Sequence, residues 1–151
     1  MPLRFPLSRA QRHAQFRREQ LEEQTERPAV CIVEDDQDML TTLSGALRDD
    51  GYRVFEAPDA SHVVEWLSHF WGPMNTIDVI ITDQKMPETT GLELLDKLRR
   101  RNWPTQVILM SAFADDTLRR EAYRLGASAV MAKPFLLDDL IGEVNRLAPP
   151  G

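Results

Sequence analysis

The stretch AVCIVEDD, residues 29–36, decides which fold we expect for this chain. Its first five residues are apolar without interruption, which is typical of a strand buried on both faces of a parallel sheet. Four further short runs follow at Tyr52–Glu56, Ile77–Thr82, Gln106–Met110 and Ser128–Ala132. The sequence therefore predicts five short, mostly buried strands.

Apolar residues recur with helical spacing after each of these runs. Each set forms an apolar stripe along one face of a predicted helix. The five stripes are Leu40, Leu43 and Leu47; Val63, Leu67 and Phe70; Leu92, Leu95 and Leu98; Leu118, Ala122 and Leu125; Leu140, Val144 and Leu147. Alternating strands and helices indicate a parallel sheet covered on both faces. The fold class we expect is α/β, a doubly wound, flavodoxin-like sheet in the strand order 2-1-3-4-5 with five helices.

Three arginines, residues 99–101, end the third helical stripe. Cations are favourable near the C-terminus of a helix because they complement its macrodipole. We interpret all three as a solvated helix end.

Composition narrows the function classes. The chain has 151 residues, 42% of them hydrophobic and 28% charged, which predicts one ordered domain. Residues 28–151 hold 12 basic and 20 acidic residues, which argues against direct nucleic-acid binding. Cys31 is the single cysteine, so an internal disulfide and a multi-cysteine zinc site are excluded. No apolar run approaches the roughly 18 residues of a membrane span, and we expect a cytoplasmic chain without membrane contact.

Residues 1–27 differ from the rest of the chain. They carry six Arg and four Glu, and their few large apolar residues are poorly spaced for a packed helix. Ser8 is a suitable N-cap for a helix that runs to about Glu26. We expect a flexible or partly helical extension over 1–27, the main domain over 28–148, and a tail or the start of a linker over 149–151.

Acidic residues follow the first and third strands. In the order 2-1-3-4-5, ligands bind where the strand order reverses, between these two strands. The first strand ends in Glu34, Asp35 and Asp36, and the third ends in Asp83. Like charges about 4 Å apart repel by roughly 4 kcal/mol at an effective dielectric constant near 20. A divalent cation with oxygen ligands relieves that repulsion, and the pattern is typical of Mg²⁺.

The fourth and fifth strands add a hydroxyl, Ser111, and an ammonium group, Lys133. Carboxylates, a metal, a hydroxyl and a lysine together suit a transient phosphoryl group. Asp83 would be the nucleophile that forms an acyl phosphate. The metal and Lys133 would neutralise the phosphoryl oxygens, and Ser111 would donate a hydrogen bond to one of them. Each residue alone has an ordinary structural explanation, so the prediction depends on their joint placement at four strand ends.

The segments that carry these residues resemble the receiver domain of two-component response regulators. The matching segments are CIVEDD (31–36), DVIITDQKMP (78–87) with Gly91, VILMSA (107–112), and Gly126-Ala127 through Lys133-Pro134-Phe135. The resemblance extends from about residue 29 to 147. It implies a phosphorylation-controlled signalling switch, not a turnover enzyme, whose phosphodonor is a histidine kinase or a phosphotransfer protein.

The resemblance also assigns roles to residues. It implies that Asp83 is the phosphoacceptor, and that Glu34, Asp35, Asp83 and the backbone carbonyl of Lys85 bind Mg²⁺. Ser111 and Lys133 match the hydroxyl and lysine of the family, whose Lys-Pro peptide, here Lys133-Pro134, is usually cis. A homodimer, an output domain or an output protein is the expected recipient of the signal.

The chain departs from the family at two positions. The fifth strand usually carries Tyr or Phe where this chain has Val130, a short β-branched residue with no ring to rotate. We therefore expect the switch to act through Ser111, Phe113 and the fourth helix. Lys85 places a cation two residues after the phosphoacceptor, which we expect to alter the lifetime of the phosphate.

Two other functions stay open. A phosphatase or phosphotransferase can also use an aspartyl phosphate, but its common form needs a second Asp where this chain has Lys85. An interaction module that keeps the fold without being phosphorylated is favoured by Val130. It is opposed by the intact acidic pair after the first strand together with Asp83, Ser111 and Lys133. No Gly-rich phosphate loop precedes a helix, which argues against NTPases and dinucleotide enzymes.

Overall fold

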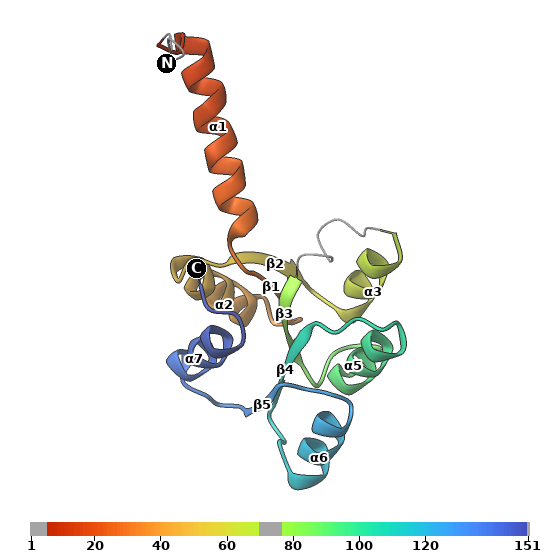
Figure 1. The fold of residues 1–151 in the computed structure, drawn as a ribbon. Helices are drawn as coiled ribbons and strands as arrows, with labels where there is room; N and C mark the ends of the chain where they lie inside the picture. The colour runs from red at the N-terminus through yellow and green to blue at the C-terminus, as the bar shows by residue number, and fades with distance from the viewer. Residues whose placement is uncertain (1–5, 70–76, 151) are drawn as a thin grey trace.

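Five parallel strands form one sheet in the computed structural model, in the order β2-β1-β3-β4-β5 (Figure 1). The structure describes residues 6–69 and 77–150, without the side chains of 20–26 and 67–69. The strands are β1 (Ala29–Val33), β2 (Arg53–Ala57), β3 (Ile77–Asp83), β4 (Gln106–Ser111) and β5 (Ala129–Ala132). The predicted strands and their order are confirmed, with bounds that differ by no more than one residue.

Helices cover both faces of the sheet. They are α2 (Gln37–Asp49), α3 (Ala60–His69), α5 (Gly91–Arg100), α6 (Asp116–Arg124) and α7 (Leu137–Leu147), and α1 (Arg9–Glu26) precedes the sheet. The helices α2 and α7 lie on one face, and α3 and α5 on the other (Figure 1). The five helices predicted for residues 28–148 are present in the described part of the chain. The sixth helix is α1.

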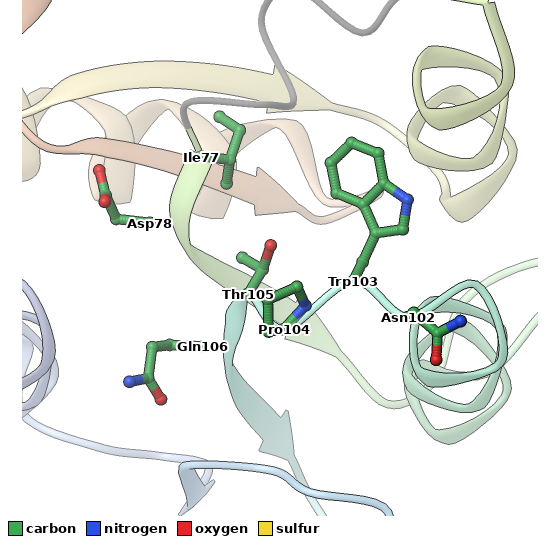
Figure 2. Close-up of a pocket in the computed structure, with 7 residues that line it drawn as sticks. All are labelled: Ile77, Asp78, Asn102, Trp103, Pro104, Thr105 and Gln106. Carbon is green, nitrogen blue, oxygen red and sulfur yellow. The ribbon is translucent and has the colours of Figure 1, made fainter.

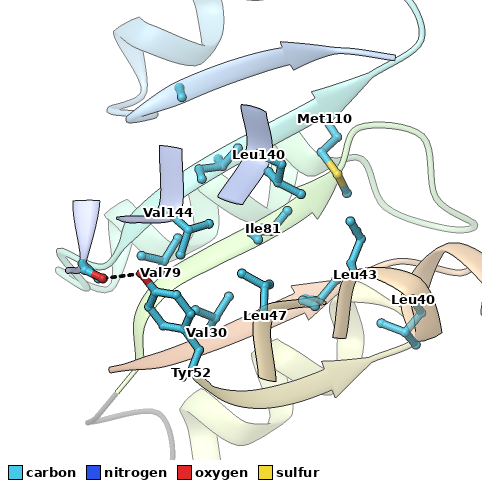
Figure 3. Close-up of a cluster of buried hydrophobic side chains, with 14 residues drawn as sticks. Val30, Leu40, Leu43, Leu47, Tyr52, Val79, Ile81, Met110, Leu140 and Val144 are labelled. Atoms are coloured by element: carbon cyan, nitrogen blue, oxygen red, sulfur yellow. Dashed lines mark hydrogen bonds between the residues drawn. The ribbon is translucent and has the colours of Figure 1, made fainter. Parts of the chain in front are cut away.

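Alternate residues of each strand supply the two cores, because side chains alternate across a sheet. Val30 and Ile32 pack with α2 and α7, whereas Cys31 and Val33 pack with α3 and α5. Figure 3 shows the first of these cores, where the side chains of Leu43 and Leu47 on α2 meet those of Leu140 and Val144 on α7 over the strands. The Cys31 thiol is fully buried, and burial raises its pKa to about 12.

Tyr52 ties the end of α7 to the sheet. It directly precedes β2, and its phenol oxygen lies 2.7 Å from the carbonyl oxygen of Ala148, to which it donates (Figure 3). Burial, with a smaller contribution from the charge of Asp50, raises the pKa of Tyr52 to about 12. The side chain of Ala148, directly after α7, is buried in the same core.

The stripe predicted for α5 needs one correction. Leu94, Leu95 and Leu98 are fully buried under this helix, whereas Leu92 is half-buried. The face of α5 that meets the sheet therefore includes Leu94, and Leu92 turns toward the hollow at the carboxyl end of the strands. Phe70, predicted on the stripe of α3, lies outside the described residues.

The prediction of a solvated arginine cluster is wrong for Arg99. Its guanidinium donates hydrogen bonds to the carbonyl oxygens of Trp103 (2.6 Å), Thr105 (3.0 Å) and Gly126 (2.9 Å). These carbonyls belong to the loops that lead into β4 and β5. Arg99 therefore joins two loops at the amino end of the sheet, and burial lowers the pKa of its guanidinium.

The extension forms the helix α1, which projects away from the sheet (Figure 1). Its N-terminus is a capping box: the Ser8 hydroxyl accepts from the backbone N–H of Gln11 (3.2 Å), and the Gln11 side chain accepts from the backbone N–H of Ser8 (2.8 Å). The side chains from Arg9 to Glu19 are all exposed. Residues 1–5 of the predicted extension and residue 151 of the predicted tail lie outside the described residues.

None of the helices described has both the length and the apolar character that a membrane span requires.

Candidate functional site

Three carboxylates meet at the carboxyl ends of β1 and β3. One oxygen each of Glu34, Asp35 and Asp83 lies within 4.8 Å of the others. The register of the two strands, in which Val33 is level with Thr82, brings the residues that follow to the same edge of the sheet. Glu34 and Asp83 are buried, whereas Asp35 is exposed. The structure thus brings together all three carboxylates that the sequence predicted for a metal site.

Asp36, the third acidic residue after β1, has a different environment. Its side chain accepts a hydrogen bond from the backbone N–H of Met39 (2.9 Å), so it is the N-cap of α2. The negative charge there also complements the positive end of the helix macrodipole. Only two of the three acids after β1 therefore belong to the carboxylate group.

Lys133 reaches these carboxylates from the loop after β5. Its ammonium nitrogen lies 3.3 Å from Oδ2 of Asp83 and 3.4 Å from Oε2 of Glu34. Its backbone N–H donates to the carbonyl oxygen of Ser111 (2.8 Å), which holds the loop beside the end of β4. The peptide bond between Lys133 and Pro134 is cis, as the resemblance implies.

The charge of the group is not balanced by protein atoms alone. Burial raises the pKa of Glu34, and the negative charge of Asp83 raises it further; the backbone N–H of Asp36 and the ammonium of Lys133 oppose these effects. Three carboxylates face one ammonium group, which leaves an excess of negative charge at an edge lined by hard oxygen donors. This donor set fits Mg²⁺, which prefers carboxylate oxygens and keeps part of its water shell.

Ser111 and Lys85 border the same space as Asp83 and Lys133, a hollow of about 590 Å³. The Ser111 hydroxyl oxygen accepts a hydrogen bond from the backbone N–H of Phe113 (3.0 Å). The hydrogen of this hydroxyl stays available for a group bound in the hollow. Phe113 itself is 81% exposed, so its ring stands at the surface directly after the site.

Gln84 and Gly91 support the site, and residue patterns alone did not single out Gln84. The Gln84 side chain accepts from the backbone N–H of Leu92 (2.9 Å), and its backbone carbonyl accepts from the N–H of Gly91 (2.9 Å). These bonds hold the start of α5 against the residue that follows Asp83. The one available signal in the sequence is the position of Gln84 next to the expected nucleophile.

Val130 and Arg119 show how the fourth β–α unit is held. Val130 is buried in a small cluster with Leu109 and Ala122. Arg119, on α6, donates to the carbonyl oxygens of Ala114 (3.2 Å) and Val130 (3.2 Å). One side chain thus links the loop after Ser111 to β5, a contact that the sequence pattern does not predict.

A second hollow, of about 420 Å³, lies at the opposite edge of the sheet, where β3 and β4 begin (Figure 2). Its lining includes Asp78, Trp103 and Thr105. The Asp78 carboxylate accepts from the backbone N–H of Ala29 (2.9 Å). The carboxylate therefore has a structural task, which is to hold the start of β1, and we assign no function to this hollow.

Residues 30–145 match the response regulator receiver domain family. The chain belongs to this family. A receiver domain is a phosphorylation-controlled signalling switch, and a signalling domain of this kind is not a classical enzyme. The match spans the sheet from Val30 of β1 to the end of β5 and includes the residues that form the carboxylate group.

Individual proteins and one solved structure resemble this receiver domain over 80% of the chain. It is 31% identical over 121 residues to the DNA-binding transcriptional regulator NtrC of Escherichia coli, an alignment that covers 80% of this chain and 25% of that protein. It is 25% identical over 120 residues to the sporulation initiation phosphotransferase F of Bacillus subtilis, covering 80% of this chain and 93% of that protein. The structure of the Francisella response regulator 1452 receiver domain has a TM-score of 0.72 and 30% identity, over 80% of this chain and 95% of that one.

The receiver domain spans about a quarter of the length of NtrC and about half of PrrA from Mycobacterium tuberculosis. These relatives are transcriptional regulators by name.

Proposed function

We propose that Asp83 accepts a phosphoryl group from a histidine kinase or a phosphotransfer protein in the cytoplasm. The observation that carries this proposal is the group of three carboxylate oxygens within 4.8 Å, with the Lys133 ammonium 3.3 Å from Asp83. Glu34, Asp35, Asp83 and the backbone carbonyl of Lys85 would hold Mg²⁺. The proposal includes an output partner, either a second copy of the chain or another domain or protein.

The chemistry follows from the groups around Asp83. A carboxylate oxygen of Asp83 attacks the phosphorus, the bond from phosphorus to the donor nitrogen breaks, and the donor keeps that electron pair. Lys133 is positioned to pair with the oxygens of the transferred group, and the Ser111 hydroxyl to donate a hydrogen bond to one of them. When bound, Mg²⁺ supplies positive charge to the phosphoryl oxygens. The carboxylate–Lys133 pair exists before transfer, so little rearrangement is needed.

The reaction is a single transfer followed by hydrolysis of the acyl phosphate. Self-phosphorylation from a small donor and self-dephosphorylation are the only reactions that we propose for the chain. A phosphatase or phosphotransferase acting on other substrates receives no support from the site, because Lys85 stands where such an enzyme would carry its second Asp.

The test is incubation with a small acyl phosphate donor and Mg²⁺, followed by the intact mass of the native protein. We expect one phosphoryl adduct on the unaltered chain and none on Asp83→Asn. Asp36→Asn is the matched control, because Asp36 follows the same strand but caps α2, and Asn is an equally good N-cap. An adduct that persists in Asp83→Asn, or its absence from the unaltered protein, would reject the proposal.

A second measurement tests the metal. Mg²⁺ should raise the melting temperature of the unaltered chain, because it neutralises the converging carboxylates. Asp35→Asn should melt higher than the unaltered chain without metal, because one repulsive charge is removed, and should gain less from Mg²⁺. An unchanged metal response in this variant would exclude Asp35 as a ligand.

A further inference from the structure

One face of α1 is basic and carries an exposed aromatic ring. Four residues share this side of the helix because they are spaced i, i+3, i+4 and i+7, namely Arg9, Arg12, His13 and Phe16. All four are exposed, and Phe16 is 62% exposed. Anchors with this spacing are typical of a helix that binds in a groove of a partner.

The positive charge of this face is unfavourable for α1 by itself. The N-terminal end of a helix carries partial positive charge and therefore favours acidic residues. The first turn of α1 has no acidic residue, and Arg9 and Arg12 add positive charge at this end. An acidic surface that covers the face would therefore stabilise the helix.

A shallow hollow of about 660 Å³ lies at β5, which is the edge strand of the sheet. It is lined by β5, by the loop after this strand and by the first half of α7. Its apolar lining includes Pro134, Phe135 and Leu136, and Leu136 is 70% exposed. The hollow thus has an apolar wall that the described part of the chain leaves open to solvent.

The same hollow is acidic. Three residues of α7 that line it carry a negative charge, namely Asp138, Asp139 and Glu143, and the described residues of its lining include no basic one. Glu143 pairs with Arg146 (2.6 Å) on the same helix. The two aspartates stand exposed in the first turn of α7. The hollow therefore suits a ligand that is both basic and apolar.

We propose that the basic face of α1 binds in the hollow beside β5 of a second copy of this chain. The ring of Phe16 packs against Leu136 of the second copy, and the two arginines pair with the first-turn acids of its α7. At a rise of about 1.5 Å per residue, Arg9 to Phe16 spans about 10.5 Å and Asp138 to Glu143 about 7.5 Å. The two sets of groups therefore have comparable lengths.

The fold favours a contact between copies over a contact within one chain. α1 continues into β1, which β3 and β4 separate from β5, and it projects away from the sheet (Figure 1). The basic face lies in the half of α1 that is farther from β1, so a second domain can reach it. The hollow beside β5 shares no lining residue with the hollow at Asp83, and the contact therefore leaves that site open.

The experiment uses sedimentation of the full chain and of two charge-reversal variants. Variant one carries Arg9→Glu with Arg12→Glu, and variant two carries Asp138→Lys with Asp139→Lys. We expect the unaltered chain to associate, and about 1 M salt to weaken the association by at least about tenfold. Each variant alone should lose the association. Their equimolar mixture should regain it, because each α1 then meets a hollow of opposite charge.

A matched variant separates the contact from folding. Glutamates in variant one agree with the dipole of α1, whereas lysines in the first turn of α7 oppose the dipole of that helix. Asp38→Lys with Asp116→Lys makes the same change in the first turns of α2 and α6, and should leave the association intact. The proposal is overturned if the unaltered chain is a monomer at all concentrations. It is also overturned if variant two associates normally, which would place α1 elsewhere, or if the matched variant loses as much as variant two.

Two alanine variants test the apolar part of the contact. Phe16→Ala and Leu136→Ala should each weaken the association by about tenfold or more, because both remove an anchor. Leu7→Ala is the control, since Leu7 is also exposed but lies nine residues before Phe16 and so on the opposite side of α1. Equal losses in Leu7→Ala and Phe16→Ala would show that this face of α1 is not the one that binds.

Cross-linking locates the contact. A Cβ atom added at Gly142, which lines the hollow, meets no atom within 4 Å, and the same holds for Gly45 on α2. A mixture of His13→Cys and Gly142→Cys chains should form disulfide-linked heterodimers, whereas His13→Cys with Gly45→Cys should not. The Cys31 thiol is buried and does not interfere. Equal cross-linking in the two mixtures would reject the inference.

Discussion

Gly91 is the residue whose small size the site depends on most directly. A Cβ atom at this position would lie 2.6 Å from the backbone carbonyl oxygen of Asp83 and would also clash with the side chain of Leu109. The Leu109 side chain is fully buried, and the carbonyl oxygen belongs to the last residue of β3. The start of α5 can therefore approach Asp83 only because residue 91 has no side chain.

Gly91→Ala should lower the free energy of unfolding by about 1–3 kcal/mol, the usual cost of overpacking, and slow phosphorylation of Asp83. Gly142→Ala is the matched control, because that glycine is also helical and has no atom within 4 Å of an added Cβ. Alanine there should be neutral or stabilise α7 by up to about 1 kcal/mol. Urea unfolding curves and adduct formation over time measure both effects, and equal behaviour of the two variants would contradict the argument.

At the scale of elements, Arg99 connects parts of the chain that are distant in sequence. Its three hydrogen bonds join the end of α5 to the loops before β4 and β5. Arg100, its neighbour, makes an ion pair with Asp96 (2.9 Å) on the same helix and is 78% exposed. Two adjacent arginines thus have different expected contributions to stability.

Arg99→Met should cost about 1–3 kcal/mol of unfolding free energy, because it leaves carbonyl oxygens without their donor while the methionine keeps most of the apolar stem. Arg100→Met should cost at most about 1 kcal/mol, as for other exposed ion pairs. Chemical denaturation of the two variants side by side gives the comparison. A loss that is equal in both, or larger for Arg100→Met, would show that the hydrogen bonds of Arg99 contribute little.

The loop between β4 and α6 is the element through which we expect the switch to act. Ser111 accepts from the backbone N–H of Phe113, and Arg119 binds the carbonyls of Ala114 and Val130. Movement of Ser111 toward a phosphoryl group would break the first contact and strain the second. This loop therefore has a physical connection both to the site and to α6.

Ser111→Ala or Phe113→Ala should weaken the difference between the phosphorylated and free forms, whereas Val130→Ala should change it little. Val130 lacks a ring that could rotate between two positions, so it cannot transmit a movement of Ser111. Amide hydrogen exchange on both forms measures the difference. Protection changes centred on β5 that spare residues 111–120 would show that this view of the switch is wrong.

At the scale of the whole molecule, the receiver domain and α1 are structurally separate over the described residues. Deletion of residues 1–27 should leave the domain folded, with a melting temperature close to that of the full chain, and still phosphorylated on Asp83. The physical reason is that the described side chains of α1 are exposed and add no core. Thermal melts and intact mass provide the test, and a large drop in melting temperature would show that the extension packs on the domain.

Much of the fold could be predicted from the sequence because burial leaves a periodic signal. The five short apolar runs predict strands covered on both faces, and the helical stripes between them predict the crossovers, so the sheet order follows from general rules. The same rules bring the ends of β1 and β3 together, which is why Glu34, Asp35 and Asp83 can be grouped from the sequence alone. Their chemical roles remain predictions.

Other features were decided by the tertiary structure alone. Arg99 and Arg119 carry the same charge as a solvated arginine, and only the position of distant carbonyls determines what they bind. Gln84 supports α5 because that helix starts beside it, which no spacing in the sequence reveals. Periodicity reports whether a position is buried within its own element, whereas a hydrogen bond between elements depends on where both of them lie in space.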